Sequence, residues 1–145
     1  MPYRIIFFFF MLVAFKANAN TIINTQSINY SVVVSFGSMC CGTASDDFLK
    51  NFVKQFNTKN KVVISAMQVG GCGREGEYKI LFSLEKLKEA KKIKFVTALK
   101  KLIPEQNEKN KTVKASSGPV TLDYNLPFNK LENCRGQLTK WQPAQ

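Results

Sequence analysis

Four cysteines are the residues of this chain with the clearest chemical potential. They are Cys40, Cys41, Cys72 and Cys134. Thiols form disulfides, bind soft metal ions or act as nucleophiles. The cellular compartment decides between these uses, because structural disulfides persist mainly outside the reducing cytosol. The N-terminal sequence is therefore the first guide to the chemistry.

The N-terminus has the three parts of a secretory signal peptide. Arg4 supplies positive charge, residues 5–15 are an unbroken apolar run, and residues 17–19 read Ala-Asn-Ala, a small-x-small cleavage pattern. The run is shorter than the roughly 20 apolar residues that a membrane-spanning helix needs. We predict that residues 1–19 are removed. The rest, residues 20–145, is expected to be one exported domain, periplasmic or secreted, without a transmembrane segment.

An even number of cysteines in a small exported protein favours two disulfides. The topology predicted below brings the loop with Cys40 and Cys41 to the same end of a sheet as the turn with Cys72. We therefore predict that one of the adjacent pair is bonded to Cys72 and the other to Cys134. A strained Cys40–Cys41 bond is the alternative.

The same cysteines also suit a soft metal ion. Met39, Cys40, Cys41 and Cys72 would together supply sulfur ligands of the kind that Cu(I) prefers. The segment Gly37-Ser38-Met39-Cys40-Cys41-Gly42 is similar to the heavy-metal-associated domains of copper chaperones, which carry thiolates in this loop of a split βαβ fold. Those domains separate their two cysteines by two residues, whereas here they are adjacent and their side chains diverge. Our first expectation is thus no metal and no cofactor.

A glycine-rich turn carries the most unusual charged string, Gly73-Arg74-Glu75-Gly76-Glu77. Arg74, Glu75 and Glu77 are a candidate recognition surface at the tip of a hairpin. The alternative is a plain turn, in which the glycines supply positive φ angles and Arg74 pairs with a nearby glutamate. The string is not a phosphate loop, because it lacks the lysine–hydroxyl ending.

Hydrophobic periodicity predicts the elements that position these residues. Strands are predicted at residues 30–36, 62–69, 77–82 and 120–124. One helix is capped by Ser45 and ends near residues 57–60. A second is capped by Ser83 and ended by Pro104. A charged linker at 105–111 and a mostly irregular tail at 125–145 complete the chain, with Trp141 expected in the core.

The predicted order is strand, helix, strand, strand, helix, strand. That order is typical of the ferredoxin-like split βαβ fold, an α+β arrangement with two helices on one face of an antiparallel sheet. The alternative is another α+β sandwich with an extra N-terminal strand at residues 21–24.

Composition narrows the function. The chain has no histidine, which excludes Ser-His-Asp and Cys-His catalysis and histidine metal sites. No other catalytic constellation is evident, so we predict a non-enzyme. The formal net charge is +11, but the lysines are scattered over both predicted helices, and no specific nucleic-acid binding is expected. The leading hypothesis is an exported, disulfide-stabilised binding or inhibitor-like module with an unidentified protein partner. The alternative is a thiol or soft-metal protein of the cell envelope.

Overall fold

The computed structural model describes residues 29–113, 117–127, 131 and 133–143 of the chain. The predicted signal peptide and the alternative strand at residues 21–24 lie outside the described residues. The elements follow in the order β1 (Asn29–Ser38), α1 (Asp47–Asn60), β2 (Ser65–Val69), β3 (Tyr78–Ser83), α2 (Glu89–Val113), β4 (Ser117–Pro127) and β5 (Thr139–Trp141).

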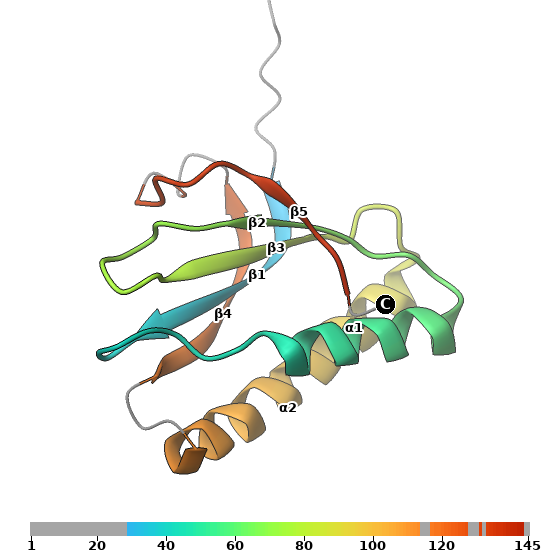
Figure 1. Ribbon diagram of the computed structural model, residues 1–145. Helices are drawn as coiled ribbons and strands as arrows, with labels where there is room; N and C mark the ends of the chain where they lie inside the picture. The colour runs from blue at the N-terminus through green and yellow to red at the C-terminus, as the bar shows by residue number, and fades with distance from the viewer. Residues whose placement is uncertain (1–28, 114–116, 128–130, 132, 144–145) are drawn as a thin grey trace, which may run out of the picture.

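The strands form one antiparallel sheet in the order β4-β1-β3-β2-β5 (Figure 1). An α+β fold with an antiparallel sheet and two helices is therefore confirmed. The fifth strand was not predicted. β5 has only three residues, with no alternating pattern to mark it, and it pairs with the edge of β2, where Trp141 lies opposite Ala66. The prediction that the tail is mostly irregular is wrong at β5 and at the end of β4, which runs to Pro127.

The interior strand β1 is buried on both of its faces. Val32, Val33 and Val34 are each fully inaccessible to solvent. Val32, Val34 and Phe36 belong to the core beneath the helices, and Val33 belongs to a second cluster on the opposite face. A strand covered on both faces needs a continuous apolar run instead of alternation, which accounts for the three consecutive valines.

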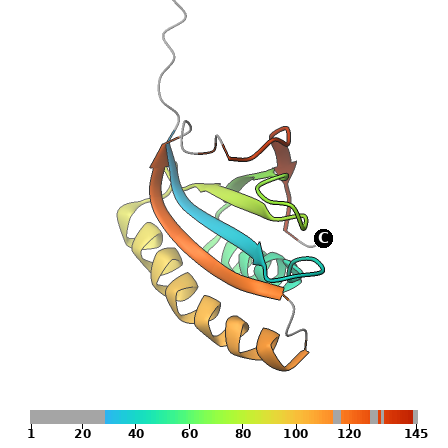
Figure 2. The same cartoon turned by 90° about the vertical axis from the view of Figure 1, so that its left-hand side faces the viewer.

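Both helices cover the same face of the sheet (Figure 1; Figure 2). In α1, Leu49, Val53 and Phe56 face the sheet at helical spacing, as the sequence predicts. Phe56 also packs edge-on against Phe95 of α2, with 5.1 Å between ring centroids. Full burial of each such side chain contributes about 1.5–3 kcal/mol, so this stripe fixes α1 on the sheet.

The second helix differs from the prediction at both ends. Ser83 does not cap it, because β3 ends at Ser83 and α2 begins at Glu89. Pro104 does not end it, because α2 continues through residues 105–111 to Val113. A proline inside a helix costs about 3 kcal/mol, but Pro104 is exposed and its neighbour Ile103 is buried against the sheet. Figure 2 shows α2 following the curve of β4 along its whole length.

The C-terminal tail covers the face of the sheet opposite the helices. Leu131 is buried there against Val33, Val69 and Leu81, and Leu138 packs at the margin of the same cluster. Trp141 returns to the other cluster, where it is 5% exposed, so its predicted core position is confirmed. Within the described part of the chain, no helix combines the length and apolarity needed to cross a membrane.

Candidate functional site at the loop end of the sheet

Two connections that are far apart in the sequence meet at one end of the sheet. We call this region the loop end, and it comprises residues 39–42 between β1 and α1 and residues 70–77 between β2 and β3 (Figure 1; Figure 2). The two parts also interact electrostatically, since the charge of Glu75 contributes to the pKa of Cys40. Their proximity is what the sequence predicts.

The β1–α1 connection is fixed on both sides of its two cysteines. The hydroxyl of Ser38 donates a hydrogen bond of 2.8 Å to the carbonyl of Gly42. Cys41 and Gly42 have φ angles of 67° and 106°, which close a tight turn. The hydroxyl of Tyr78 donates to the carbonyl of Ala44 at 3.3 Å. Burial raises the pKa of Tyr78 far above the ordinary value, so this hydroxyl remains a donor.

Cys40 and Cys41 are free, exposed thiols in this connection. A hydrogen bond joins the thiols of Cys40 and Cys41, with 2.9 Å between the two Sγ atoms. This bond is the main cause that raises the pKa of Cys40 above the ordinary thiol value, and the charge of Glu75 adds to it. The prediction that Cys40 and Cys41 are bonded to Cys72 and Cys134 is wrong.

The disulfide of the structure instead joins Cys72 to Cys134, which are 62 residues apart in the sequence. The reason is the direction of the Cys72 side chain. It is half-buried and packs against the second cluster, as Leu138 does. The tail must cross this face to cover its apolar residues, and it brings Cys134 to Cys72. Proximity of the two loops is therefore not sufficient for the predicted bond.

The tail also braces the hairpin tip through its backbone. The N–H of Arg135 donates to the carbonyl of Gly71 at 3.1 Å, and the N–H of Gly136 donates to the carbonyl of Gly70 at 3.0 Å. A side chain at Gly71 would press on the backbone of Gly136, and Gly71 has a φ of 65°. Glycine is thus required where the tail crosses the tip.

The three residues predicted as a recognition surface have different roles. Arg74 and Glu75 are exposed, whereas Glu77 is half-buried. The Glu77 carboxylate accepts a hydrogen bond of 2.8 Å from the N–H of Glu75, and its carbonyl accepts one of 2.9 Å from the N–H of Cys72. A side chain at Gly73 would collide with the Glu77 carboxylate. Glu77 therefore shapes the tip that presents Arg74 and Glu75.

The four sulfur ligands of the alternative soft-metal hypothesis are not all available. Cys72 is bonded to Cys134, so Met39, Cys40 and Cys41 remain. Met39 is 74% exposed. No group of three or more cysteine and carboxylate side chains that could hold a metal ion occurs among the described residues.

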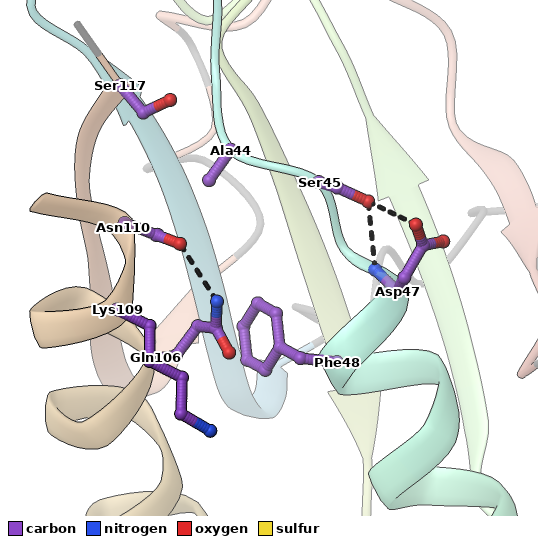
Figure 3. Close-up of a pocket in the computed structure, with 8 residues that line it drawn as sticks. All are labelled: Ala44, Ser45, Asp47, Phe48, Gln106, Lys109, Asn110 and Ser117. Carbon is purple, nitrogen blue, oxygen red and sulfur yellow. Dashed lines mark hydrogen bonds between the residues drawn. The ribbon is translucent and has the colours of Figure 1, made fainter. Parts of the chain in front are cut away.

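A pocket of about 300 Å³ lies between the start of α1 and the last turns of α2 (Figure 3). Its lining residues are Ala44, Ser45, Asp47, Phe48, Gln106, Lys109, Asn110 and Ser117. The N-cap of α1 is Asp46 and not the predicted Ser45, although Ser45 accepts a hydrogen bond of 3.2 Å from the N–H of Asp47. Asn110 Nδ2 and Ser117 Oγ are buried without a hydrogen-bond partner. The sequence did not indicate this pocket, because residues 105–111 read as a linker.

A scan against protein-family models, a search of curated proteins and a search of solved structures find no match to this chain. Functional inference therefore depends on the residues and their geometry.

Proposed function

We propose that this chain is a small exported binding module that contacts a protein partner through the loop end. The observation that carries the proposal is the bracing of the hairpin tip. One disulfide, two backbone hydrogen bonds from the tail and two hydrogen bonds to Glu77 hold residues 70–77 in one conformation. A loop that is already ordered loses little conformational entropy on binding, which is how inhibitor-like loops gain affinity.

The side chains of the loop end suit such a contact. Met39 offers an exposed apolar group, and Arg74 and Glu75 offer opposite charges at the same end of the sheet. Interfaces commonly combine an apolar centre that contains methionine or arginine with a polar rim. The partner that fits is a protein with an apolar depression flanked by charged groups of both signs.

An exchange of charges at the tip tests the proposal. Arg74→Glu with Glu75→Lys reverses both charges and leaves the net charge unchanged. Lys59→Glu with Glu85→Lys does the same with two exposed residues outside the loop end, one in the last turn of α1 and one between β3 and α2. Biotinylated mature protein is cross-linked in an envelope fraction. A partner captured by the wild type and the control, but lost from the tip variant, supports the loop end. Equal capture by all three proteins contradicts it.

The binding module is also proposed to be exported and to have a ferredoxin-like fold. The N-terminal pattern supports export, and the native protein should begin near Asn20. Soluble cytoplasmic protein that still carries residues 1–19 would contradict this. The order β4-β1-β3-β2 of the first four strands, all antiparallel, supports the split βαβ description, with β5 as an addition at the edge of β2.

A thiol or soft-metal protein is the second candidate, and one observation favours it. Cys40 and Cys41 are both free and exposed, with Met39 beside them. These sulfurs suit Cu(I). Anaerobic titration of the reduced protein with Cu(I) distinguishes the candidates. Stoichiometric binding that is lost in Cys40→Ser with Cys41→Ser favours the metal protein, and binding that is unchanged in this variant excludes the site.

A further inference from the structure

We propose that Cys40 and Cys41 are a thiol–disulfide exchange site, which reduces a disulfide substrate and closes into a vicinal disulfide. The site takes small or exposed disulfides, because both thiols lie on the surface. This activity does not depend on the protein partner proposed above, since only the geometry of the β1–α1 connection carries it.

The two sulfur atoms are already close to bonding distance. They are 2.9 Å apart, within about 1 Å of the roughly 2.05 Å length of a disulfide bond. The Ser38–Gly42 hydrogen bond closes the backbone around both cysteines, and the positive φ of Cys41 is part of the same turn. Small rotations of the two side chains are therefore sufficient to form the bond.

The remaining cysteines cannot compete for this role. Cys72 and Cys134 are bonded to each other. Among the four cysteines of the chain, the neighbour is then the one thiol that can resolve a mixed disulfide at Cys40 or Cys41. The chain thus separates its cysteines into a structural bond and a reactive pair.

The reaction balances with a disulfide as the oxidant. One loop thiol loses its proton, and its sulfur attacks one sulfur of the substrate R–S–S–R. The substrate bond breaks, and the first R–S⁻ leaves with the electron pair and takes up a proton. The second loop thiolate attacks the protein sulfur of the mixed disulfide and expels the second R–S⁻. Two loop thiols are oxidised to one disulfide, and the substrate is reduced to two thiols.

A bond between adjacent cysteines should be easy to reverse. The bond would close a small ring that contains the planar peptide bond between the two residues, and the planarity of that peptide strains the ring. The resulting strain makes a disulfide more readily reducible. The hydrogen bond between the two thiols also raises the pKa of Cys40, so exchange should accelerate as the pH rises and Cys40 loses its proton.

Exchange with glutathione tests the inference on the mature protein. The protein is first treated with a low concentration of reduced glutathione, then with oxidised glutathione, quenched in acid, alkylated and digested with trypsin. We expect the peptide that ends at Lys50 to carry two alkyl groups before oxidation. Afterwards it should carry none and no glutathione, at a mass lower by two hydrogens. The Cys72–Cys134 bond should remain throughout.

Single variants provide the control for the second step, in which the neighbouring thiol displaces glutathione from the mixed disulfide. Cys40→Ser and Cys41→Ser should retain glutathione on the remaining cysteine. The wild type should retain at least about tenfold less, because its second thiol attacks intramolecularly. Both cysteines are exposed, so the variants should fold, and unchanged circular dichroism checks this. A wild-type peptide that keeps two alkylatable thiols, or that holds glutathione as the single variants do, would overturn the proposal.

Discussion

At the scale of single residues, the loop end concentrates the chemistry of the chain in two adjacent thiols and one charged hairpin. The pKa of Cys40 is raised first by its hydrogen bond with Cys41, then by desolvation and the charges of Cys41 and Glu75. A raised pKa means less thiolate at a given pH. Cys40 should thus react slowly at neutral pH and faster as the pH approaches its pKa.

Two substitutions separate these causes. Cys41→Ala removes the hydrogen bond and should give the larger fall in the pKa of Cys40. Glu75→Gln removes only a distant charge and should give a smaller fall. The rate of alkylation of the peptide containing Cys40 by iodoacetamide, followed from pH 7 to pH 10, measures both. We expect Cys41→Ala to react fastest at pH 8, Glu75→Gln to react more slowly and the wild type to react slowest. Alkylation of Cys41 is counted separately from alkylation of Cys40. Slower reaction of either variant contradicts the assignment.

Several contacts at the start of α1 depend on Asp46. It accepts a hydrogen bond of 2.7 Å from the indole N–H of Trp141 and forms an ion pair of 2.9 Å with Lys50. The contact with Trp141 ties the start of α1 to β5. The sequence predicts the buried ring, but not this partner, because 95 residues separate the two side chains.

Trp141→Phe should lower the free energy of unfolding by about 1–2 kcal/mol. The ring still fills most of the space against Phe82, while a hydrogen bond to a carboxylate is lost. Asp46→Ala should lower it further, because it also removes the ion pair with Lys50. Urea unfolding followed by circular dichroism measures both variants. A phenylalanine variant as stable as the wild type would show that the indole N–H does not stabilise β5.

At the scale of elements, the edge of the sheet at β4 is protected by a side chain of α2. The amide of Asn107 donates to the carbonyl of Val120 and accepts from its N–H, both at 2.9 Å. This pair of bonds replaces a neighbouring strand at that point. An unpaired edge invites pairing with another chain, so we expect Asn107 to limit self-association as well as to position α2.

Asn107→Ala should lower stability by about 1–3 kcal/mol, because it leaves two backbone groups of the buried Val120 without partners. It should also increase association with protein concentration. Asn110→Ala is a matched control on the same helix, since it removes only the hydrogen bond of 2.8 Å from the Gln106 amide to Asn110 Oδ1 and leaves both bonds to Val120 intact, so its cost should be smaller. Chemical unfolding and sedimentation velocity give the two readouts. Equal effects of the two variants would assign no special role to Asn107.

The elements themselves show where sequence patterns are sufficient. The apolar stripe of α1 and the valine run of β1 predict their elements because burial alone determines them. Pro104 and Ser83 mislead because local rules would end and begin a helix there, whereas Ile103 and Asn107 hold the helix onto β4. The three residues of β5 carry no periodic signal. Their pairing depends on the position of Trp141, which only the tertiary structure determines.

At the scale of the whole molecule, the Cys72–Cys134 bond holds the tail over the second face of the sheet. The tail covers Val33 and Leu81 with the side chain of Leu131, and it braces the hairpin tip with the backbone of Arg135 and Gly136. The cysteine count correctly indicates a disulfide, but the connectivity could not be derived. The predicted pairing considered only the closeness of two loops, and it omitted the apolar face that the tail has to cover.

Removal of the Cys72–Cys134 bond should lower the free energy of unfolding considerably. Closing a loop of about 60 residues is worth roughly 4 kcal/mol in the chain-entropy model, a large part of the 5–15 kcal/mol typical of a domain. The double variant Cys72→Ser with Cys134→Ser should lose about 4 kcal/mol of stability. Cys40→Ser with Cys41→Ser should lose almost none. The fluorescence of Trp141, the one tryptophan of the chain, reports unfolding in both. Equal destabilisation by the two double variants would contradict this division of the cysteines.

The most direct test of that division is a peptide map of the native protein without reduction. After blocking of free thiols, trypsin cuts on both sides of each relevant segment, and Cys72 falls in peptide 62–74 while Cys134 falls in peptide 131–135. We predict that these two peptides are joined to each other, and that Cys40 and Cys41 remain together in the peptide that ends at Lys50, linked to neither. A bond from Cys40 or Cys41 to Cys72 or Cys134 would contradict the separation into a structural disulfide and a reactive pair.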